Sequence, residues 1–188
     1  MEIEENPCQE LLLSSLTEYY NSNPQNKTSL KEIIEGRHKL SLRLIDWLVT
    51  HYAKTRNIFY WTHKNVDGIF MEYPESVDNN DEYIRKVNIY LDYRAQLKSY
   101  AKINFDSFRR HNRITFILSP DLYIETTIGQ LNFFRWAFQN KVIDYALLNY
   151  SSIYGDMIRN NATKKRYSKK NNTTIQDITK TMCMLRFD

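Results

Sequence analysis

The stretch "TTIGQLNFFRWAFQNKVIDYALLNY", from Thr126 to Tyr150, is the densest apolar segment of the chain and constrains its fold more than any other. At helical spacing, one set of side chains forms a single stripe: Leu131, Phe134, Phe138, Val142 and Tyr145. A second set widens this stripe until most of the circumference is apolar: Phe133, Trp136, Ala137, Ile143 and Leu147. Because a helix that is apolar nearly all round is buried inside its domain, the segment predicts a central buried helix. Thr126 or Thr127 is its expected N-cap, and "QNK" is the place where it is expected to divide in two.

A narrow polar strip remains on this helix, formed by Asn132, Arg135 and Gln139 at positions i, i+3 and i+7. Side chains of these types hydrogen-bond base edges, so the strip is a candidate secondary surface for reading a partner. The alternative is a core helix whose one polar strip touches water or a partner domain. The surrounding apolar residues favour this alternative.

Turn residues are scarce, with four glycines and four prolines among 188 residues, which argues against an all-β fold. We predict an α+β, predominantly helical single domain with a small β-hairpin or sheet beside the central buried helix. Helices are expected at 10–20, from an N-cap at Ser29 to Gly36, at 41–57, and over most of 87–105. The segments "IFYW" and "GIFMEY" are expected to pair as a hairpin, and "RITFIL" is a further candidate strand.

The expected organisation is an N-terminal extension at residues 1–9, one domain at 10–157, and a flexible basic tail at 158–188. The tail contains "RNNATKKRYSKKNNTT", which is too polar to fold alone. Its Lys164, Lys165 and Arg166 are candidate contacts to a phosphate backbone. The alternative is a tail that is simply solvated.

No targeting or membrane-spanning segment is predicted, because the N-terminus lacks a basic region and no window approaches about eighteen consecutive apolar residues. We therefore expect no membrane partner and a protein that is not secreted. Cys8 and Cys183 lie near opposite ends, without a paired Cys or His motif, so neither a disulfide framework nor a zinc site is expected. No cofactor is expected.

Recognisable catalytic motifs are absent from the sequence. The four histidines, His38, His51, His63 and His111, fall in no metal-binding pattern, and there is no glycine-rich phosphate loop or nucleophile elbow. Six acidic residues are the candidates for the carboxylate cluster of a cryptic carboxylate or metal enzyme: Asp46, Asp67, Asp92, Asp106, Glu125 and Asp144. Acidic residues are usually solvated, so we predict a protein that is not an enzyme.

The segment "YRAQLKSYAKINFDSFRRHNRI" is the leading candidate for a functional surface. Its helical spacing predicts one shared face for Arg94, Lys98 and Lys102 (or Tyr100), and Arg109, Arg110 and Arg113 follow just beyond that helix. Four aromatic residues interleave with these cations: Tyr93, Tyr100, Phe105 and Phe108. Cations contact phosphates and aromatic rings stack on bases, so the mixture suits nucleic acid. The alternative is that the rings are core and the cations form the wet face; "FDSF" itself is expected to be a structural turn capped by Asp106.

Three segments, "SLRLIDWLVTHYAK", "YRAQLKSYAKINFDSFRR" and "ETTIGQLNFFRWAFQNKVIDY", resemble a small protein family of large nucleocytoplasmic DNA viruses of protists. The resemblance spans roughly Ser41 to Tyr150. The family pattern has proline where this chain has Ser107, so a looser local turn is expected here. The resemblance implies a viral context, in the host cytoplasm (viral factory) or the virion, and no particular activity.

The leading hypothesis is a non-enzymatic, nucleic-acid-associated viral protein acting in gene expression or genome handling. The partner would be DNA or RNA, held by the basic residues of 94–113 and of the tail. The second hypothesis is a protein-interaction or virion scaffold module that presents the same aromatic and arginine surface to a viral or host protein. The cryptic enzyme ranks third.

Overall fold

The computed structural model of the chain describes residues 7–64, 66–74 and 84–163. The chain divides into two compact units, residues 1–150 and 151–188, and each is described by itself. The first unit is α+β and predominantly helical, as predicted. Its elements in chain order are α1 (Pro7–Ser22), α2 (Pro24–Ile34), α3 (Leu42–Trp47), a π-helical turn η1 (Leu48–Tyr52), α4 (Ala53–Arg56), β1 (Phe59–His63), β2 (Val66–Phe70), β3 (Ile84–Asn88), α5 (Ile89–Asn104), β4 (Ile114–Ser119), β5 (Leu122–Thr126), α6 (Ile128–Gln139) and α7 (Val142–Leu148).

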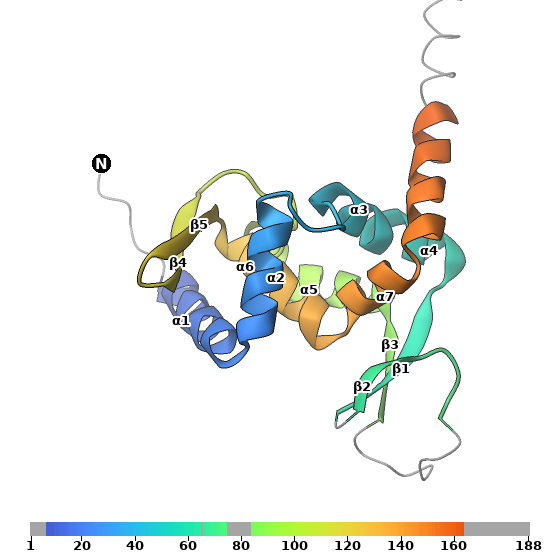
Figure 1. Cartoon of the computed structure of the whole chain (residues 1–188), viewed down its shortest axis with the longest axis horizontal. Coiled ribbons are helices and arrows are strands. Elements are labelled where there is room, and N and C mark those ends of the chain that lie inside the picture. Colours follow the sequence, from blue (N-terminus) through green and yellow to red (C-terminus); the bar gives the residue numbers. More distant parts are fainter. Residues whose placement is uncertain (1–6, 65, 75–83, 164–188) are drawn as a thin grey trace, which may run out of the picture. The chain divides into compact units, whose positions relative to one another are not determined.

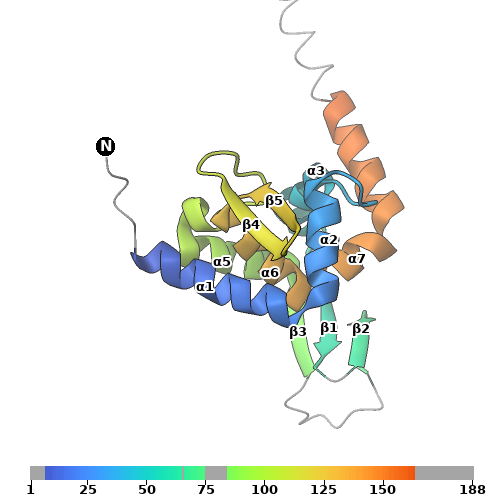
Figure 2. The ribbon, with the colours of Figure 1, turned by 60° about the vertical axis from the view of Figure 1, so that its left-hand side comes forward.

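Helix α6 is the centre of the core, which confirms the expectation of a central buried helix. Leu131, Phe133 and Phe134 are all 0% exposed, and burying a side chain of this size contributes about 1.5–3 kcal/mol. Both α1 and α5 pack against α6, as Figures 1 and 2 show. The Tyr20 hydroxyl of α1 donates a hydrogen bond of 2.8 Å to the carbonyl of Leu131. The apolar circumference of α6 is therefore covered by other helices of the same unit.

Both ends of α6 lie where the sequence predicts them. Thr127 is the N-cap, and its hydroxyl accepts a hydrogen bond of 3.1 Å from the Gln130 amide. The helix ends at Gln139 and α7 begins at Val142, so the expected division at "QNK" is confirmed. Lys141 makes the turn with a left-handed backbone, φ 56° and ψ 26°.

The N-terminal helices begin earlier than predicted. Helix α1 begins at Pro7, inside the expected extension. Helix α2 begins at Pro24, in the polar stretch that was expected to separate two helices, because a proline at the first helical position loses no hydrogen bond. Ser29 therefore lies inside α2 and is not its N-cap. Gly36, with φ 73°, follows the helix end as predicted.

The predicted hairpin is present and belongs to a larger sheet. Strand β1 pairs antiparallel with β2, and β1 also pairs antiparallel with β3, which the sequence did not predict. The strand order is β2-β1-β3, and Figure 1 shows this sheet extending away from the helices. Tyr60 anchors it to the core, because its hydroxyl donates a 2.6 Å hydrogen bond to the Asn140 carbonyl and its fully buried ring stacks on Tyr145.

The predicted strand "RITFIL" is β4, and it pairs with β5 in a separate two-stranded antiparallel sheet. One face of this sheet is buried through Phe116, Leu118 and Ile124. The opposite face exposes the cross-strand pair of Ile117 and Tyr123, which are 67% and 62% exposed. This pair is the most exposed apolar contact in either sheet of the described chain.

The second unit begins with a helical segment, residues 151–163. Residues 158–163 are thus helical, whereas the sequence predicted a flexible tail from residue 158. Lys164, Lys165 and Arg166 lie outside the described residues. No helix in the described part of the chain is long and apolar enough to span a membrane.

Candidate nucleic-acid interface

Helix α5 carries the first predicted cations, Arg94 and Lys98, which are exposed and one helical turn apart. The predicted continuation to Lys102 is wrong. Ala101 has φ 56° and ψ 163°, a backbone that only glycine adopts readily, and it divides α5 into two helical pieces. The i+4 spacing from Lys98 to Lys102 therefore does not place these two side chains on one face.

Lys102 instead approaches Asp106, with 3.8 Å between its ammonium and the carboxylate. Asp106 belongs to the turn at Phe105–Phe108, which the sequence correctly predicts to be structural. The Asp106 carboxylate accepts a hydrogen bond of 2.8 Å from the Phe108 amide. Phe105 is fully buried and anchors the turn.

The looser turn expected at Ser107 stays a prediction, and in this structure Ser107 is buried and hydrogen-bonded on two sides. Its side chain is 2% exposed, and its hydroxyl donates a hydrogen bond of 3.2 Å to the Asp46 carboxylate of α3. The Ser107 carbonyl accepts a second one, 3.0 Å long, from the Gln130 side chain of α6. The Ser107 hydroxyl thus links the turn to α3.

Two members of the six-carboxylate set, Asp46 and Asp106, lie close enough for their charges to interact. Burial raises the pKa of Asp46, the Ser107 hydrogen bond opposes this, and the Asp106 charge adds to it. Burial likewise raises the pKa of Asp92, opposed by Arg85, which lies 3.8 Å away on β3. Among the described residues, no three His, Cys, Asp or Glu side chains are grouped to hold a metal ion.

The aromatic side chains of the predicted surface turn inward. Phe105 packs against both Phe133 and Trp136 of α6, with ring centroids 5.4 and 5.7 Å apart. Tyr93 also contacts these three rings, and Tyr100 stacks on Phe105 at 6.3 Å. Phe105 belongs to the core around α6, and Tyr93 and Tyr100 are half-buried beside it. Base stacking by this stretch stays a prediction, and most of its cations are more exposed than its aromatic rings.

The remaining cations lie on the connection between α5 and β4, which Figure 2 shows as a loop above the β4–β5 sheet. Arg110 and Arg113 are exposed, whereas Arg109 is half-buried and its Cδ lies 3.4 Å from the point where Gly129 would carry a Cβ. Arg113 also lines a shallow cleft of about 380 Å³ together with Tyr123. Arg109 thus packs on α6, while Arg110 and Arg113 present charge to solvent.

The cations of the described chain differ in whether a carboxylate lies within ion-pair distance. No described carboxylate lies within ion-pair distance of Arg94, Lys98, Arg110 or Arg113. By contrast Lys102 pairs with Asp106, and both Lys31 and Arg37 pair with Glu35. Four of the six predicted phosphate contacts in 94–113 are therefore exposed and have no intramolecular counter-ion in the described part of the chain.

The predicted secondary surface on α6 is wrong at Asn132, which is 1% exposed. Its amide nitrogen donates to the Asn104 carbonyl at 2.9 Å, and its oxygen accepts from Arg135 at 2.8 Å. Arg135 also donates to Ser15 of α1 and to Tyr100 of α5. Gln139 alone is exposed. Asn132 and Arg135 of the polar strip therefore link α6 to α1 and α5 through hydrogen bonds.

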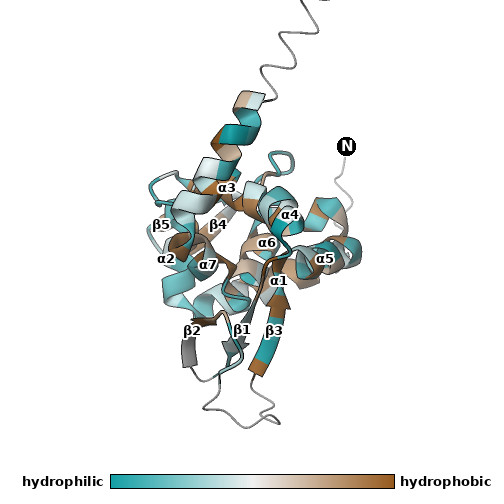
Figure 3. Ribbon diagram, turned by 90° about the vertical axis from the view of Figure 1, so that its right-hand side faces the viewer, coloured by the Kyte–Doolittle hydropathy of each residue, from teal (hydrophilic) through white to brown (hydrophobic). Residues whose placement is uncertain are grey.

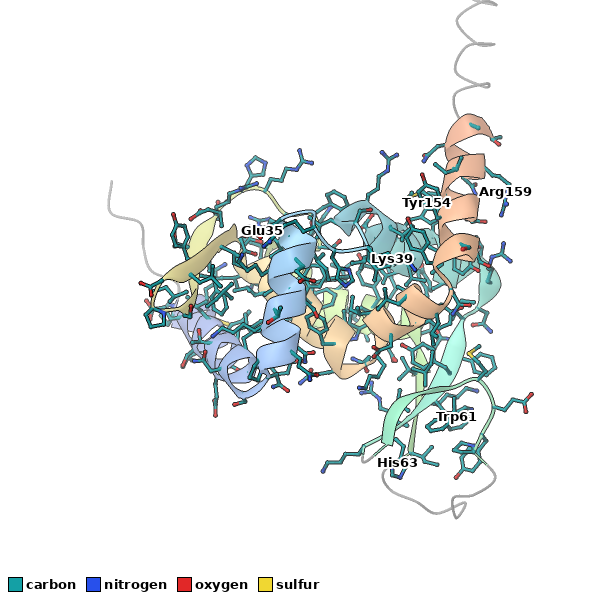
Figure 4. The ribbon with its side chains drawn as sticks, viewed as in Figure 1. Glu35, Lys39, Trp61, His63, Tyr154 and Arg159 are labelled. Carbon is teal, nitrogen blue, oxygen red and sulfur yellow. The ribbon has the colours of Figure 1, made fainter. Side chains whose placement is uncertain are left out.

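An aromatic and basic surface that the sequence analysis missed lies on the β2-β1-β3 sheet. Alternation along β1 places Phe59, Trp61 and His63 on the face opposite the buried Tyr60. The register sets Lys86 of β3 directly across from Trp61, and the Lys86 ammonium lies 4.2 and 5.5 Å from the ring centroids of Phe59 and Trp61. Figure 4 shows Trp61 and His63 on this projecting sheet. Alternation in "IFYWTH" was the available signal; the partner strand β3 was not predicted.

The described structure is thus a small helical α+β protein with an aromatic sheet face and four exposed cations that have no described counter-ion, two on α5 and two on the following loop. The chain belongs to the family described as a family of unknown function, DUF7197, whose model matches residues 6–185. It is similar to a protein of Acanthamoeba polyphaga mimivirus named "Uncharacterized protein L507", with 30% identity over 178 residues. The alignment covers 92% of this chain and 62% of that relative. No solved structure shows a significant match.

These matches confirm the resemblance to a giant-virus protein family and correct its extent. The family match includes α1, α2 and the C-terminal segment, whereas the resemblance was placed between Ser41 and Tyr150. The helices that cover α6 are therefore part of the family pattern. The chain spans less than two thirds of the length of the mimivirus relative.

Proposed function

We propose that this chain is a non-enzymatic, nucleic-acid-associated protein that acts in the gene expression or genome handling of a giant virus. The observation that carries the proposal is the group of four exposed cations without a described counter-ion: Arg94, Lys98, Arg110 and Arg113. An unpaired surface cation gains most from a phosphate, because binding releases the condensed counter-ions of the nucleic acid. The proposed location is the host cytoplasm (viral factory) or the virion.

The roles of the predicted residues differ within this proposal. Arg94, Lys98, Arg110 and Arg113 hold phosphates directly. Lys102 and Arg109 contribute less, since Asp106 neutralises the first and α6 partly covers the second. Lys164, Lys165 and Arg166 add non-specific affinity. No cofactor is part of the proposal.

Fluorescence anisotropy with labelled single-stranded and duplex DNA and RNA, at low and near-physiological salt, tests it. We expect binding that weakens steeply as salt rises, and a further decrease of about tenfold or more in R110E/R113E. Binding that is insensitive to salt, or that the reversal leaves unchanged, would overturn the phosphate model. K164Q/K165Q/R166Q separates the tail from the folded unit, because its effect should add to that of R110E/R113E.

A second candidate function is a protein-interaction or scaffold module, and the exposed pair of Ile117 and Tyr123 favours it. The hypothesis drawn from the sequence needed the aromatic residues of 93–108, which lie in or beside the core. In this second candidate function, the exposed face of the β4–β5 sheet takes the role of those aromatic residues, and Arg113 lines a cleft together with Tyr123. Analytical ultracentrifugation distinguishes this candidate: self-association that I117S/Y123S abolishes supports it, and a monomer at high concentration counts against a self-assembling scaffold.

A further inference from the structure

The exposed face of the β2-β1-β3 sheet gathers aromatic side chains from separate parts of the chain. Phe59 and Trp61 come from β1, and the β1–β2 register brings Phe70 across from Trp61. Tyr73, just beyond β2, meets the Trp61 ring edge to face, with centroids 5.0 Å apart. Phe59 is 39% exposed and Trp61 is half-buried. The rings are thus held in place by their neighbours, and both keep part of their surface exposed.

Lys86, on the edge strand β3, places its ammonium above the rings of Phe59 and Trp61. In β3 the hydrophilic residues Arg85 and Lys86 stand between Ile84 and the buried Val87, a pattern that Figure 3 shows along the strand. A cation above a ring is attracted by the negative face of the π-system. A flat nucleobase offers the ring a larger stacking contact, and the flexible lysine side chain then reaches the neighbouring phosphate.

We infer that this face binds single-stranded nucleic acid, with Trp61 and Phe59 stacking on unpaired bases and Lys86 contacting the backbone. The inference rests on the proposed function and names its substrate class. Rings on a sheet face reach a base only when it is unpaired, since a duplex hides the faces of its bases in the stack. The cations Arg94, Lys98, Arg110 and Arg113 give no preference for a single strand over a duplex, because both present phosphates.

The cations of β3 indicate that stacking supplies most of the affinity of this face. Lys86 lies over the rings of Phe59 and Trp61, whereas its neighbour Arg85 lies 3.8 Å from the Asp92 carboxylate. Stacking depends weakly on salt, whereas phosphate contacts depend on it strongly. The two sites therefore differ in the salt dependence of their variants.

The test uses the full chain with a fluorescein-labelled oligodeoxythymidylate and a labelled mixed-sequence duplex. W61A should weaken binding of the single strand by about five- to a hundredfold, the range expected for removal of one base stack, and leave duplex binding unchanged. This fold-change should be the same at low and near-physiological salt. The effect of R110E/R113E should appear on both probes and shrink as salt rises.

W61F keeps a ring at the position and separates stacking from folding. It should bind the single strand within about threefold of the wild type, because phenylalanine also stacks. Oligodeoxythymidylate should quench the tryptophan fluorescence of the wild type, and W61F should lose this quenching while it still binds. Quenching that persists in W61F, with Trp47 and Trp136 as the remaining tryptophans, would contradict a base on Trp61.

Each other outcome has a definite meaning. Single-strand binding by W61A equal to the wild type overturns this inference and leaves the proposed function standing. Equal decreases on single strand and duplex overturn the preference for unpaired bases. Absence of binding to every probe by the wild type overturns both proposals. Self-association that W61A abolishes would assign the face to a second copy of the chain and also overturn the inference.

Discussion

Asn132 joins three helices through its buried side chain. Its nitrogen donates to Asn104 at the end of α5, and its oxygen holds Arg135, which reaches Ser15 on α1. A buried carbonyl that loses its donor is left unsatisfied, and this costs more than the hydrogen bond itself. We therefore expect the Asn132 side chain to contribute more to the free energy of unfolding than Gln139, the exposed member of the same polar strip.

We expect N132A to lower the free energy of unfolding by about 1–3 kcal/mol, measured by urea denaturation. Q139A, further along the same predicted strip and exposed to solvent, is the matched control and should stay within about 0.5 kcal/mol of the wild type. Equal effects of the two substitutions would mean that Asn132 is not the tie between helices described above.

Asp46 gives a pH-dependent prediction at the same scale. Burial raises its pKa above the ordinary value of 3.8, so the fold disfavours the charged carboxylate. The resulting destabilisation is absent at a pH below 3.8, develops as pH rises through the unfolded and then the folded pKa, and is complete above the folded value. D46N stays neutral at every pH and can still accept from Ser107.

The stability of D46N relative to the wild type should therefore increase from acid to neutral pH, in urea titrations at several pH values. D121N, at an exposed position of the β4–β5 turn, distinguishes burial from a general reduction of negative charge. A constant difference between D46N and the wild type over this range would show that the Asp46 carboxyl is not disfavoured by burial.

At the scale of the element, α5 shows how one residue changes a surface. The φ of 56° and ψ of 163° at Ala101 cost about 1–3 kcal/mol for a residue with a Cβ, and this cost is met by the packing of Phe105 in the core. Without the break, a continuous helix would carry Lys102 one turn beyond Lys98. The core around α6 thus decides which cations share a face.

Glycine substitutions test the break directly. A101G should leave stability unchanged or raise it by about 1 kcal/mol, because glycine adopts this backbone without strain. A95G, at an exposed position in the regular part of the same helix, should destabilise by about 1 kcal/mol, as glycine does in a helix interior. Equal destabilisation in both variants, measured by thermal unfolding, would indicate that α5 is continuous.

At the scale of the whole molecule, the arrangement of charge matters more than its sum. The net charge is +4, and several cations are already paired within the fold, among them Lys31 and Arg37, which share the Glu35 carboxylate. A paired cation must give up its carboxylate before it gains a phosphate, so it contributes little to binding. The unpaired cations should account for most of the salt dependence.

Two double variants with the same change of charge separate these contributions. R110Q/R113Q should reduce the slope of log K against log salt by about two, about one for each phosphate that the arginines no longer hold, whereas K31Q/R37Q should change it by less than about 0.5. Binding titrations over a salt series measure both slopes. Equal reductions would mean that net charge, and not the placement of Arg110 and Arg113, drives the association.

Several elements follow from the sequence alone because their causes are local. The apolar circumference of residues 128–147 requires burial, Thr127 supplies its own cap, and Asp106 closes its own turn. The hairpin of β1 and β2 also comes from neighbouring segments. These features depend on periodicity and on hydrogen bonds between residues a few positions apart.

Tertiary structure decided the rest, because it depends on partners far apart in the chain. Only the pairing of β1 with β3 sets Lys86 across from Trp61, and only the core around α6 turns Phe105 inward and engages Asn132. A sequence shows which side chains are aromatic or charged. Which of them remain exposed is determined by the distant surfaces that cover the others, and those surfaces exist only in the folded chain.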